Sequence, residues 1–330
     1  MTMRAMIIEE LGGAEVFKSA TIPRPETKPG HLLIRVEATS VNPLDCKLRS
    51  IPLPFSSPLP AVLHGDVAGV VEAVGEGVSD FQAGDEVYAC AGGVGRYSGA
   101  LAEYMAVDAD LAAHKPRSLS MAEAAALPLV TLTSWESLFD RAGVEAGDKV
   151  LIHAAAGGVG HVAIQLAKWR GAEVFATASS DEKMKIASDL GADAAINYKQ
   201  DSVADYVGAH TGGRGFDVVF DTVGGDNLER SFEAARIMGA VVTIAGGGEH
   251  NLMLMQGKGL TLHVESMLFP LLGGSGRAEQ GKILRETAKL VDEGKLKPLI
   301  DPNAFTIDRV ADAHRHLESG KAVGKVVLTW

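Results

Sequence analysis

The feature that most constrains the fold of this chain is a glycine-rich turn between an apolar run and a helical pattern. The apolar run covers residues 149–153, the turn reads AAAGGVG at residues 154–160, and the helical pattern continues to about residue 170. A strand, a tight turn and a helix in this order direct backbone N–H groups and the positive end of the helix dipole to one point. Glycines there let a pyrophosphate group approach the backbone closely. We therefore predict a dinucleotide-binding turn made of Ala155, Gly157, Gly158, Val159 and Gly160.

The motif is A-x-G-x-x-G, because Ala155 occupies the position of the usual first glycine. The alternative is a glycine turn that only packs a helix against a sheet. Strands and helices alternate around the turn, which favours nucleotide binding. The expected strands cover residues 149–153, 173–177, 194–196, 218–220 and 240–244, and the expected helices cover 158–170 and 181–190. Such alternation predicts an α/β fold with a parallel, doubly wound sheet.

The first part of the chain has a different pattern. Short β-rich runs at residues 5–8, 32–36 and 67–74 are separated by glycine and proline, which predicts a small β-barrel or sandwich. A helix at 281–294 and a final strand at 325–328 are expected to return to this domain. The 330 residues suffice for two domains of roughly 150 residues each. We predict one domain at residues 1–123 with 269–330, and the other at residues 124–268.

Composition and charge disfavour several classes of partner. The 31 basic and 42 acidic residues give a formal net charge of −11, which disfavours nucleic acid and anionic membrane surfaces. No apolar stretch reaches the roughly 20 residues that cross a bilayer, and the amino terminus does not resemble a secretory leader. We expect a cytoplasmic protein in which Cys46 and Cys90 are free thiols.

The end of the second expected strand indicates which dinucleotide binds. An acidic residue there would bind the ribose 2′-hydroxyl of NAD, but residues 177–180 read TASS. Ser179 and Ser180, with Lys183 one helical turn further on, suit a 2′-phosphate and therefore predict NADPH. The alternative is that Asp181 binds the ribose of NAD; the other interpretation of Asp181 is a helix-terminal residue that complements the dipole.

Several strings resemble the medium-chain dehydrogenase/reductase superfamily, and within it the zinc-independent branch of quinone oxidoreductases and enone (alkenal) reductases. They are SVNPLDCK at 40–47, GDVAGVV at 65–71, ALPLVTLTSW at 126–135, LGAD at 190–193 and FDVV at 216–219, together with the glycine turn. The resemblance covers nearly the whole chain. It implies a GroES-like β-barrel catalytic domain joined to a Rossmann domain, and it also implies a homodimer, with residues 241–254 as a candidate edge.

The resemblance assigns roles to individual residues. Asn42, Gly65 and Asp66 stand where zinc-dependent relatives carry a cysteine, a histidine and a glutamate, which implies that no metal is bound. His64 lies one place off a ligand position; it is interpreted as a turn histidine, with metal binding as the alternative. At the cofactor, Ser179, Lys183 and Tyr198 are implied to contact the 2′-phosphate, and Thr133 is implied to lie near the nicotinamide. Gly246 and Gly247 are candidates beside the nicotinamide; the alternative is that they form a plain loop.

Without a metal to polarise a carbonyl, the easier reaction is hydride addition to a quinone or to the β-carbon of an α,β-unsaturated carbonyl. The charge that develops on oxygen needs hydrogen-bond donors. We expect these to be the Asn42 amide and the Lys47 ammonium, with Asp45 orienting one of them; the alternative for Lys47 is a solvated surface lysine. Two further functions stay open: an NAD(P)-dependent alcohol dehydrogenase or aldehyde reductase, and a catalytically idle NADPH-binding sensor.

Overall fold

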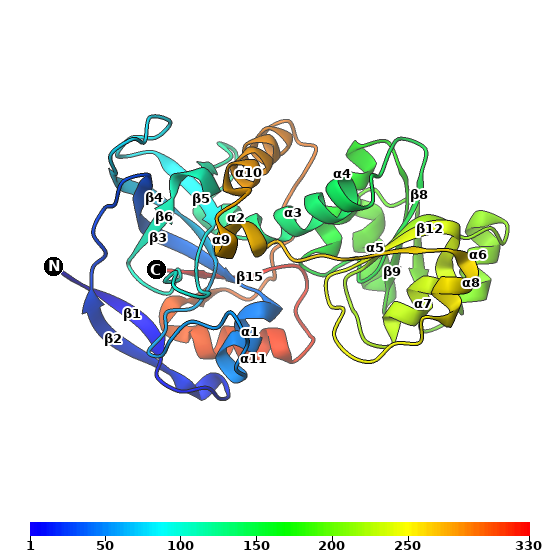
Figure 1. Ribbon diagram of the computed structural model, residues 1–330, viewed down its shortest axis with the longest axis horizontal. Coiled ribbons are helices and arrows are strands. Elements are labelled where there is room, and N and C mark those ends of the chain that lie inside the picture. Colours follow the sequence, from blue (N-terminus) through cyan, green and yellow to red (C-terminus); the bar gives the residue numbers. More distant parts are fainter. The chain divides into compact units, whose positions relative to one another are not determined.

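The computed structural model describes all 330 residues, which form two compact units. The first unit consists of Met1–Val130 and Leu268–Trp330, and the second of Thr131–Met267 (Figure 1). The carboxyl-terminal part of the chain thus belongs with the amino-terminal part. The boundary between the units falls within α3 (Pro128–Trp135), a few residues beyond the expected position at 123.

The first unit contains a seven-stranded sheet around β3 (His31–Val41), in the order β14-β15-β3-β4-β5-β7, with β6 also paired to β3. A hairpin of two further strands is separate from this sheet. The β-rich first unit that the sequence predicted thus consists of this sheet and the hairpin. The other strands are β1 (Thr2–Ile8), β2 (Phe17–Pro23), β4 (Asp66–Val74), β5 (Glu86–Cys90), β6 (Tyr104–Asp108), β7 (Ala112–His114), β14 (Phe305–Thr306) and β15 (Val326–Thr329).

Helices of the first unit include one that the sequence pattern did not reveal, α1 (Pro43–Ser50). Its start has a local cause, since Pro43 suits the first helical position and the Asn42 N–H donates to Asp45 Oδ2 (2.8 Å). The remaining helices are α2 (Met121–Ala125), α9 (Phe269–Gly273), α10 (Arg277–Asp292), α11 (Val310–Glu318) and the short 3₁₀ turns η1 (Ala14–Val16), η2 (Ala109–Leu111) and η4 (Ile307–Arg309).

The second unit is a parallel six-stranded sheet in the order β10-β9-β8-β11-β12-β13. The chain runs outward from β8 to one edge and then returns to continue from β11, which is the doubly wound arrangement that the sequence predicted. Figure 1 shows helices on both sides of this sheet. Its elements are β8 (Lys149–Ile152), α4 (Gly160–Trp169), β9 (Glu173–Ala178), α5 (Asp181–Asp189), β10 (Ala194–Asn197), α6 (Val203–Thr211), β11 (Phe216–Asp221), α7 (Asn227–Ala234), β12 (Ala235–Thr243), α8 (Met253–Lys258), β13 (Thr261–Val264) and the π-helix η3 (Glu136–Arg141).

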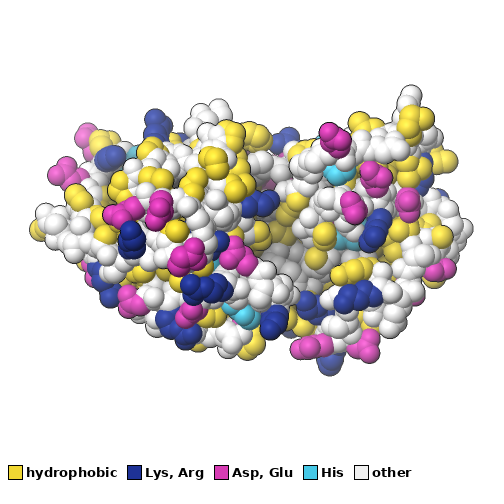
Figure 2. Space-filling view, turned by 90° about the horizontal axis from the view of Figure 1, so that it is seen from below, with side chains coloured by type: hydrophobic (Ala, Val, Ile, Leu, Met, Phe, Trp, Pro, Cys, Tyr) yellow, Lys and Arg dark blue, Asp and Glu magenta, His cyan; other side chains and the backbone are white.

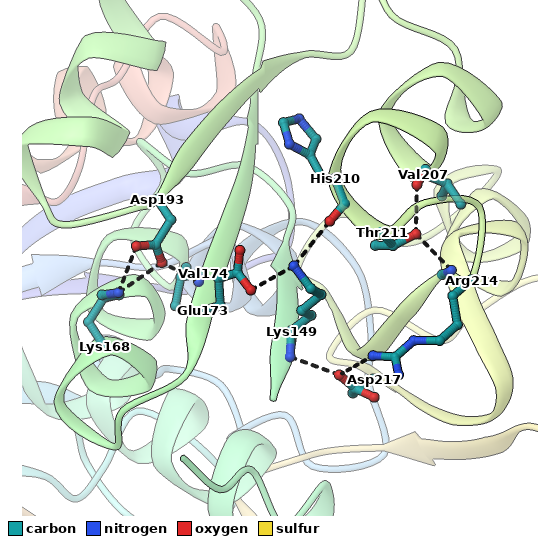
Figure 3. Close-up of polar contacts among 11 residues, drawn as sticks. Lys149, Lys168, Glu173, Val174, Asp193, Val207, His210, Thr211, Arg214 and Asp217 are labelled. Carbon is teal, nitrogen blue, oxygen red and sulfur yellow. Dashed lines mark hydrogen bonds and ion pairs between the residues drawn. The ribbon is translucent and has the colours of Figure 1, made fainter. Parts of the chain in front are cut away.

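Polar side chains at the amino ends of these strands bond to one another (Figure 3). Lys149, at the start of β8, contacts Glu173 at the start of β9 (2.6 Å) and the carbonyl of His210 (3.1 Å). The backbone N–H of Lys149 donates to Asp217 of β11 (2.9 Å), whose carboxylate also binds Arg236 (2.6 Å). These contacts tie neighbouring strands together, and they leave the opposite edge of the sheet for a ligand.

Acidic and basic side chains are not segregated on the surface. On the face that Figure 2 presents, acidic and basic side chains are interspersed, and no broad basic area is visible. That face therefore offers no concentrated positive field to a polyanion. No helix of the structure has the length and apolar character that crossing a membrane would require.

Candidate functional site

The glycine turn joins β8 to α4 and brings two backbone segments into close approach. A Cβ atom at Gly160 would lie 2.2 Å from the carbonyl oxygen of Ala154, and one at Gly157 would lie 3.1 Å from the same oxygen. Ala154 itself has a φ of 54°, in the left-handed region. The N–H of Ala155 donates to the carbonyl of Thr177 on β9 (2.9 Å), which fixes the turn against the neighbouring strand. Gly160 is thus required by the space between strand and helix.

Three polar side chains near the carboxyl ends of β9 and β10 have no hydrogen-bond partner within the chain. They are the Ser179 hydroxyl, the Lys183 ammonium and the Tyr198 hydroxyl, and Tyr198 is 46% exposed. Asn197 pairs with Ala178 in the parallel register, so the residues that follow them, Tyr198 and Ser179, also lie side by side. Ser180 has a different role, because its side chain accepts from the N–H of Lys183 (3.4 Å) and caps α5.

These three groups fit an adenosine 2′-phosphate. A phosphate binds ammonium and hydroxyl donors, and the free donors stand at the carboxyl edge of a doubly wound sheet, where such sheets bind nucleotides. Asp181 is the first residue of α5 and is exposed, which is the position of a dipole-complementing residue. No carboxylate ends β9.

The other expected cofactor residues are placed as follows. Thr133 lies on α3 and is buried. Gly246 and Gly247 follow the carboxyl end of β12, the same edge of the sheet as the glycine turn. A Cβ at Gly246 would lie 3.0 Å from Val264 of β13, whereas Gly247 has open space around it. Close packing therefore explains Gly246, and nothing in the packing requires Gly247.

In the first unit, a buried polar cluster forms around Asn42, Asp66 and Lys325, each at most 2% exposed. The Lys325 ammonium donates to Asn42 Oδ1 and lies 3.4 Å from Asp66 Oδ2. Asn42 Nδ2 donates to the same carboxylate oxygen (2.8 Å). These contacts fix the orientation of the amide, because a flipped amide would set its NH₂ against an ammonium and its oxygen against a carboxylate.

Asp66 accepts further hydrogen bonds from Ser40 (2.6 Å) and from the N–H of Leu129 (2.8 Å). Its charge is therefore well compensated. The neighbouring carboxyl, Asp45, is less well compensated: burial raises its pKa to about 7, Asp66 adds to the rise, and the Asn42 N–H and Lys325 oppose it.

Lys47 does not join the cluster as the sequence interpretation expected. It lies on the exposed face of α1, and its ammonium makes no hydrogen bond or ion pair. The ammonium that contacts Asn42 belongs to Lys325, which the sequence interpretation missed. Lys325 directly precedes β15, and the register pairs Val326 with Val41 of β3, so Lys325 lies beside Asn42. The only feature of the sequence that could have indicated this role of Lys325 is its position immediately before an apolar strand.

A chain of hydrogen bonds runs beside this cluster and has a fixed direction. The Thr39 hydroxyl donates to the carbonyl of Asp66 (2.6 Å), so it must accept from His64 Nδ1 (3.3 Å). His64 Nε2 is then an acceptor, and His314 Nε2 donates to it (2.9 Å). His314 Nδ1 in turn accepts from Arg49 (3.3 Å).

Both imidazoles are therefore neutral. Burial lowers the pKa of His314 to about 3, with the charge of Arg49 acting in the same direction. Burial, His314 and Lys325 lower the pKa of His64 well below its usual range. His64 also has a φ of 73°, an uncommon backbone conformation for a residue with a side chain. It is part of a packed turn.

The residues at the positions of the zinc ligands of relatives do not fit a zinc ion. Asn42 and Asp66 already surround an ammonium, and Gly65 has no side chain; a Cβ there would meet Cys90 Sγ at 3.2 Å. Burial raises the pKa of the Cys46 thiol to about 12 and that of Cys90 well above its usual range, which disfavours the thiolates that zinc requires.

Two protein families match this chain. The family described as alcohol dehydrogenase GroES-like domain matches residues 28–117, and the family described as zinc-binding dehydrogenase matches residues 190–328. The second description names a metal that the residues of the first unit do not suit.

Individual relatives are similar over nearly the whole chain. The 2-methylene-furan-3-one reductase of Solanum lycopersicum is 37% identical over 99% of this chain and 79% of its own length. The chloroplastic NADPH-dependent alkenal/one oxidoreductase of Arabidopsis thaliana is 36% identical with the same coverage. Among solved structures, the Escherichia coli quinone oxidoreductase complexed with NADPH matches with a TM-score of 0.87, 29% identity and 100% of both chains covered.

Proposed function

Since this chain belongs to the medium-chain dehydrogenase/reductase superfamily, we propose that it is a zinc-independent, NADPH-dependent reductase of quinones and α,β-unsaturated carbonyls. The observation that carries the proposal is the set of unpartnered groups at the carboxyl edge of the second unit's sheet. Ser179, Lys183 and Tyr198 offer two hydroxyls and one ammonium to a 2′-phosphate. NADPH supplies the hydride when it is bound.

The glycine turn and the three donors would hold two different phosphate groups of NADPH. At the turn, missing side chains and the amino end of α4 accommodate the pyrophosphate. The three donors hold the phosphate that distinguishes NADPH from NADH. Thr133 and the Gly246–Gly247 segment remain our candidates for the nicotinamide half.

In the first unit, Asn42 is the proposed donor to the acceptor oxygen. One N–H of its amide is bound to Asp66, and Lys325 polarises the carbonyl end, so the second N–H points in a fixed direction. Asp45 and Lys325 position Asn42. Conjugation already activates such an acceptor for hydride addition. Hydrogen-bond donors at its oxygen can therefore stabilise the developing negative charge in place of a Lewis acid.

We also propose a homodimer. The sequence suggested residues 241–254 as its edge, but β12 is paired with β11 on one side and with β13 on the other, so we propose the outer edge of β13 instead. This strand ends the sheet, and its outer backbone groups are unpaired within the chain. Val264 on β13 is 62% exposed, and Ile237 and Met238 at the start of β12 are 69% and 71% exposed. An apolar, unpaired edge is a template for a second copy of the same strand. The two buried free thiols, Cys46 and Cys90, fit a reducing compartment such as the cytoplasm.

The test compares NADPH with NADH as the reductant of a simple enone and of a naphthoquinone in chelator-treated protein. We expect turnover with a clear NADPH preference. Lys183→Ala should reduce that preference about 10- to 100-fold, the loss expected from removing one charged hydrogen bond of about 1.5–3 kcal/mol. Lys185→Ala is the matched control, because Lys185 lies on the same helix but pairs with Asp189 (2.7 Å). No turnover with either acceptor would contradict the proposal, and stoichiometric zinc would contradict its metal-free part.

A further inference from the structure

The phenol oxygen of Tyr97 has its acceptor capacity filled, while its own hydrogen has no acceptor within the chain. Arg277 Nη2 lies 2.6 Å from this oxygen and Arg96 Nη2 lies 3.0 Å from it. A guanidinium can only donate, so both contacts use lone pairs of the oxygen. The O–H of Tyr97 therefore points away from both arginines and is available to a ligand.

Arg277 holds the phenol in a defined place. It stands at the start of α10, and its side chain also contacts Asp108 (2.6 Å) and the carbonyls of Leu271 (2.7 Å) and Pro270 (3.2 Å). Four acceptors thus fix one guanidinium, which is 14% exposed. Tyr97 is attached to a rigid support.

The surrounding charge makes this phenol a better proton donor than a tyrosine in water. Partial burial acts to raise the pKa of Tyr97, but the hydrogen bonds and charges of Arg96 and Arg277 outweigh it, and the pKa lies below its usual value. Both guanidiniums also lie over the ring, at 5.2 and 5.3 Å from its centre. A tyrosinate formed here would be stabilised by two cations.

The loop that carries Tyr97 is fixed to the segment next to Asp66. Its two ends are bonded there, Ala91 N–H to the carbonyl of Gly65 and Ala100 N–H to the carbonyl of His64, both at 2.9 Å. At its tip, the N–H of Gly95 donates to the carbonyl of Phe55 (2.8 Å). The loop that carries Tyr97 is therefore bonded at both ends to His64 and Gly65, the two residues that directly precede Asp66.

We propose that Tyr97 donates the proton to the acceptor oxygen, an inference that rests on the proposed reduction of quinones and enones. When the acceptor gains a hydride at carbon, its π electrons move to the oxygen, which becomes anionic. The Tyr97 O–H bond breaks, its proton forms the new O–H bond of the enol or hydroquinone, and the electron pair stays on the phenolate beside Arg96 and Arg277. Water then returns the proton to Tyr97, which is half-buried.

The test variant is Tyr97→Phe, which keeps the ring and removes only the hydroxyl. We expect kcat to fall about 100-fold, the lower end of what a general acid contributes, with the KM for NADPH unchanged. The matched control is Tyr104→Phe, on β6, whose hydroxyl makes no hydrogen bond and whose ring lies under Arg24 (3.7 Å); its rate should stay within about twofold. The activity of the wild type should decline at alkaline pH as Tyr97 ionises. Arg96→Met should move this decline to higher pH, and Tyr97→Phe should abolish it.

A purely structural role would lower activity without altering the pH profile, and that result would overturn the inference, as would a Tyr97→Phe rate within twofold of the wild type. A binding measurement, which needs no turnover, distinguishes failure of the Tyr97 proposal from failure of the proposed function. We expect 4-nitrophenolate, a stable phenolate, to bind the wild type about tenfold more tightly than Tyr97→Phe. If the wild type reduces no acceptor, the proposed function is wrong, and equal 4-nitrophenolate affinities would then also remove Tyr97 as a donor to oxyanions.

Discussion

Replacing Asp45 by asparagine should change how the stability of the first unit depends on pH. The wild-type carboxyl is buried, and its pKa is raised from 3.8 to about 7. The folded state therefore binds this proton more tightly than the unfolded state. The resulting stabilisation is fully present below pH 3.8 and is lost as the pH rises through about 7.

The interval between these two pKa values corresponds to about 4 kcal/mol at about 1.36 kcal/mol per unit. About 2 kcal/mol of it is lost between pH 5 and pH 7. Asp45→Asn keeps an oxygen that can accept the Asn42 N–H but cannot ionise. The difference in unfolding free energy, variant minus wild type, should therefore rise by about 2 kcal/mol from pH 5 to pH 7 and then level off.

The measurement is urea unfolding at pH 5, 6, 7 and 8, followed by the fluorescence of Trp330 in the first unit. Trp135 and Trp169 belong to the second unit, so a Trp135→Phe/Trp169→Phe background isolates the signal. Asp80→Asn, at an exposed position, is the control and should give a difference that does not vary with pH. A pH-independent difference for Asp45→Asn would refute the reasoning, because it would mean that Asp45 is ionised throughout.

Two further predictions concern the glycine turn and the histidine pair. Gly160→Ala should destabilise the second unit by about 1–3 kcal/mol and abolish NADPH binding, since its Cβ would lie 2.2 Å from the Ala154 carbonyl oxygen; Gly208→Ala, on α6 with nothing within 4 Å, should instead be neutral or slightly stabilising. Thermal unfolding and fluorescence titration with NADPH measure both variants, and an intact NADPH affinity in Gly160→Ala would contradict the prediction. For His314, whose folded pKa of about 3 lies below the unfolded value of 6.5, stability is present above pH 6.5 and is lost as the pH falls. Between pH 6.5 and pH 5, the free energy of unfolding of His314→Gln should therefore fall by about 2 kcal/mol less than that of the wild type. If urea unfolding gives the same decrease for both proteins, His314 does not cause this effect.

Local patterns in the sequence predicted the second unit and the edge of its sheet at which we propose that NADPH binds. The alternation of strands and helices predicted a doubly wound sheet, and the structure has one. The glycine turn and the absence of an acidic residue at 177–180 are strictly local, so their consequences for a bound dinucleotide could be derived residue by residue. In the first unit, the same approach gave strands but missed α1, because its eight residues are too short to show a helical period.

Only the tertiary structure decided which side chains meet in the first unit. Lys325 contacts Asn42 across 283 positions of the chain, His314 contacts His64 across 250, and Arg277 contacts Tyr97 across 180. Such contacts depend on strand pairing, here the register that sets Val326 of β15 against Val41 of β3. A one-residue shift would turn alternate side chains to the other face of the sheet. The sequence by itself therefore determined what the second unit binds, whereas the pairing of distant strands and the burial it causes decided which charges surround Asn42 and why Asp45 holds its proton up to about pH 7.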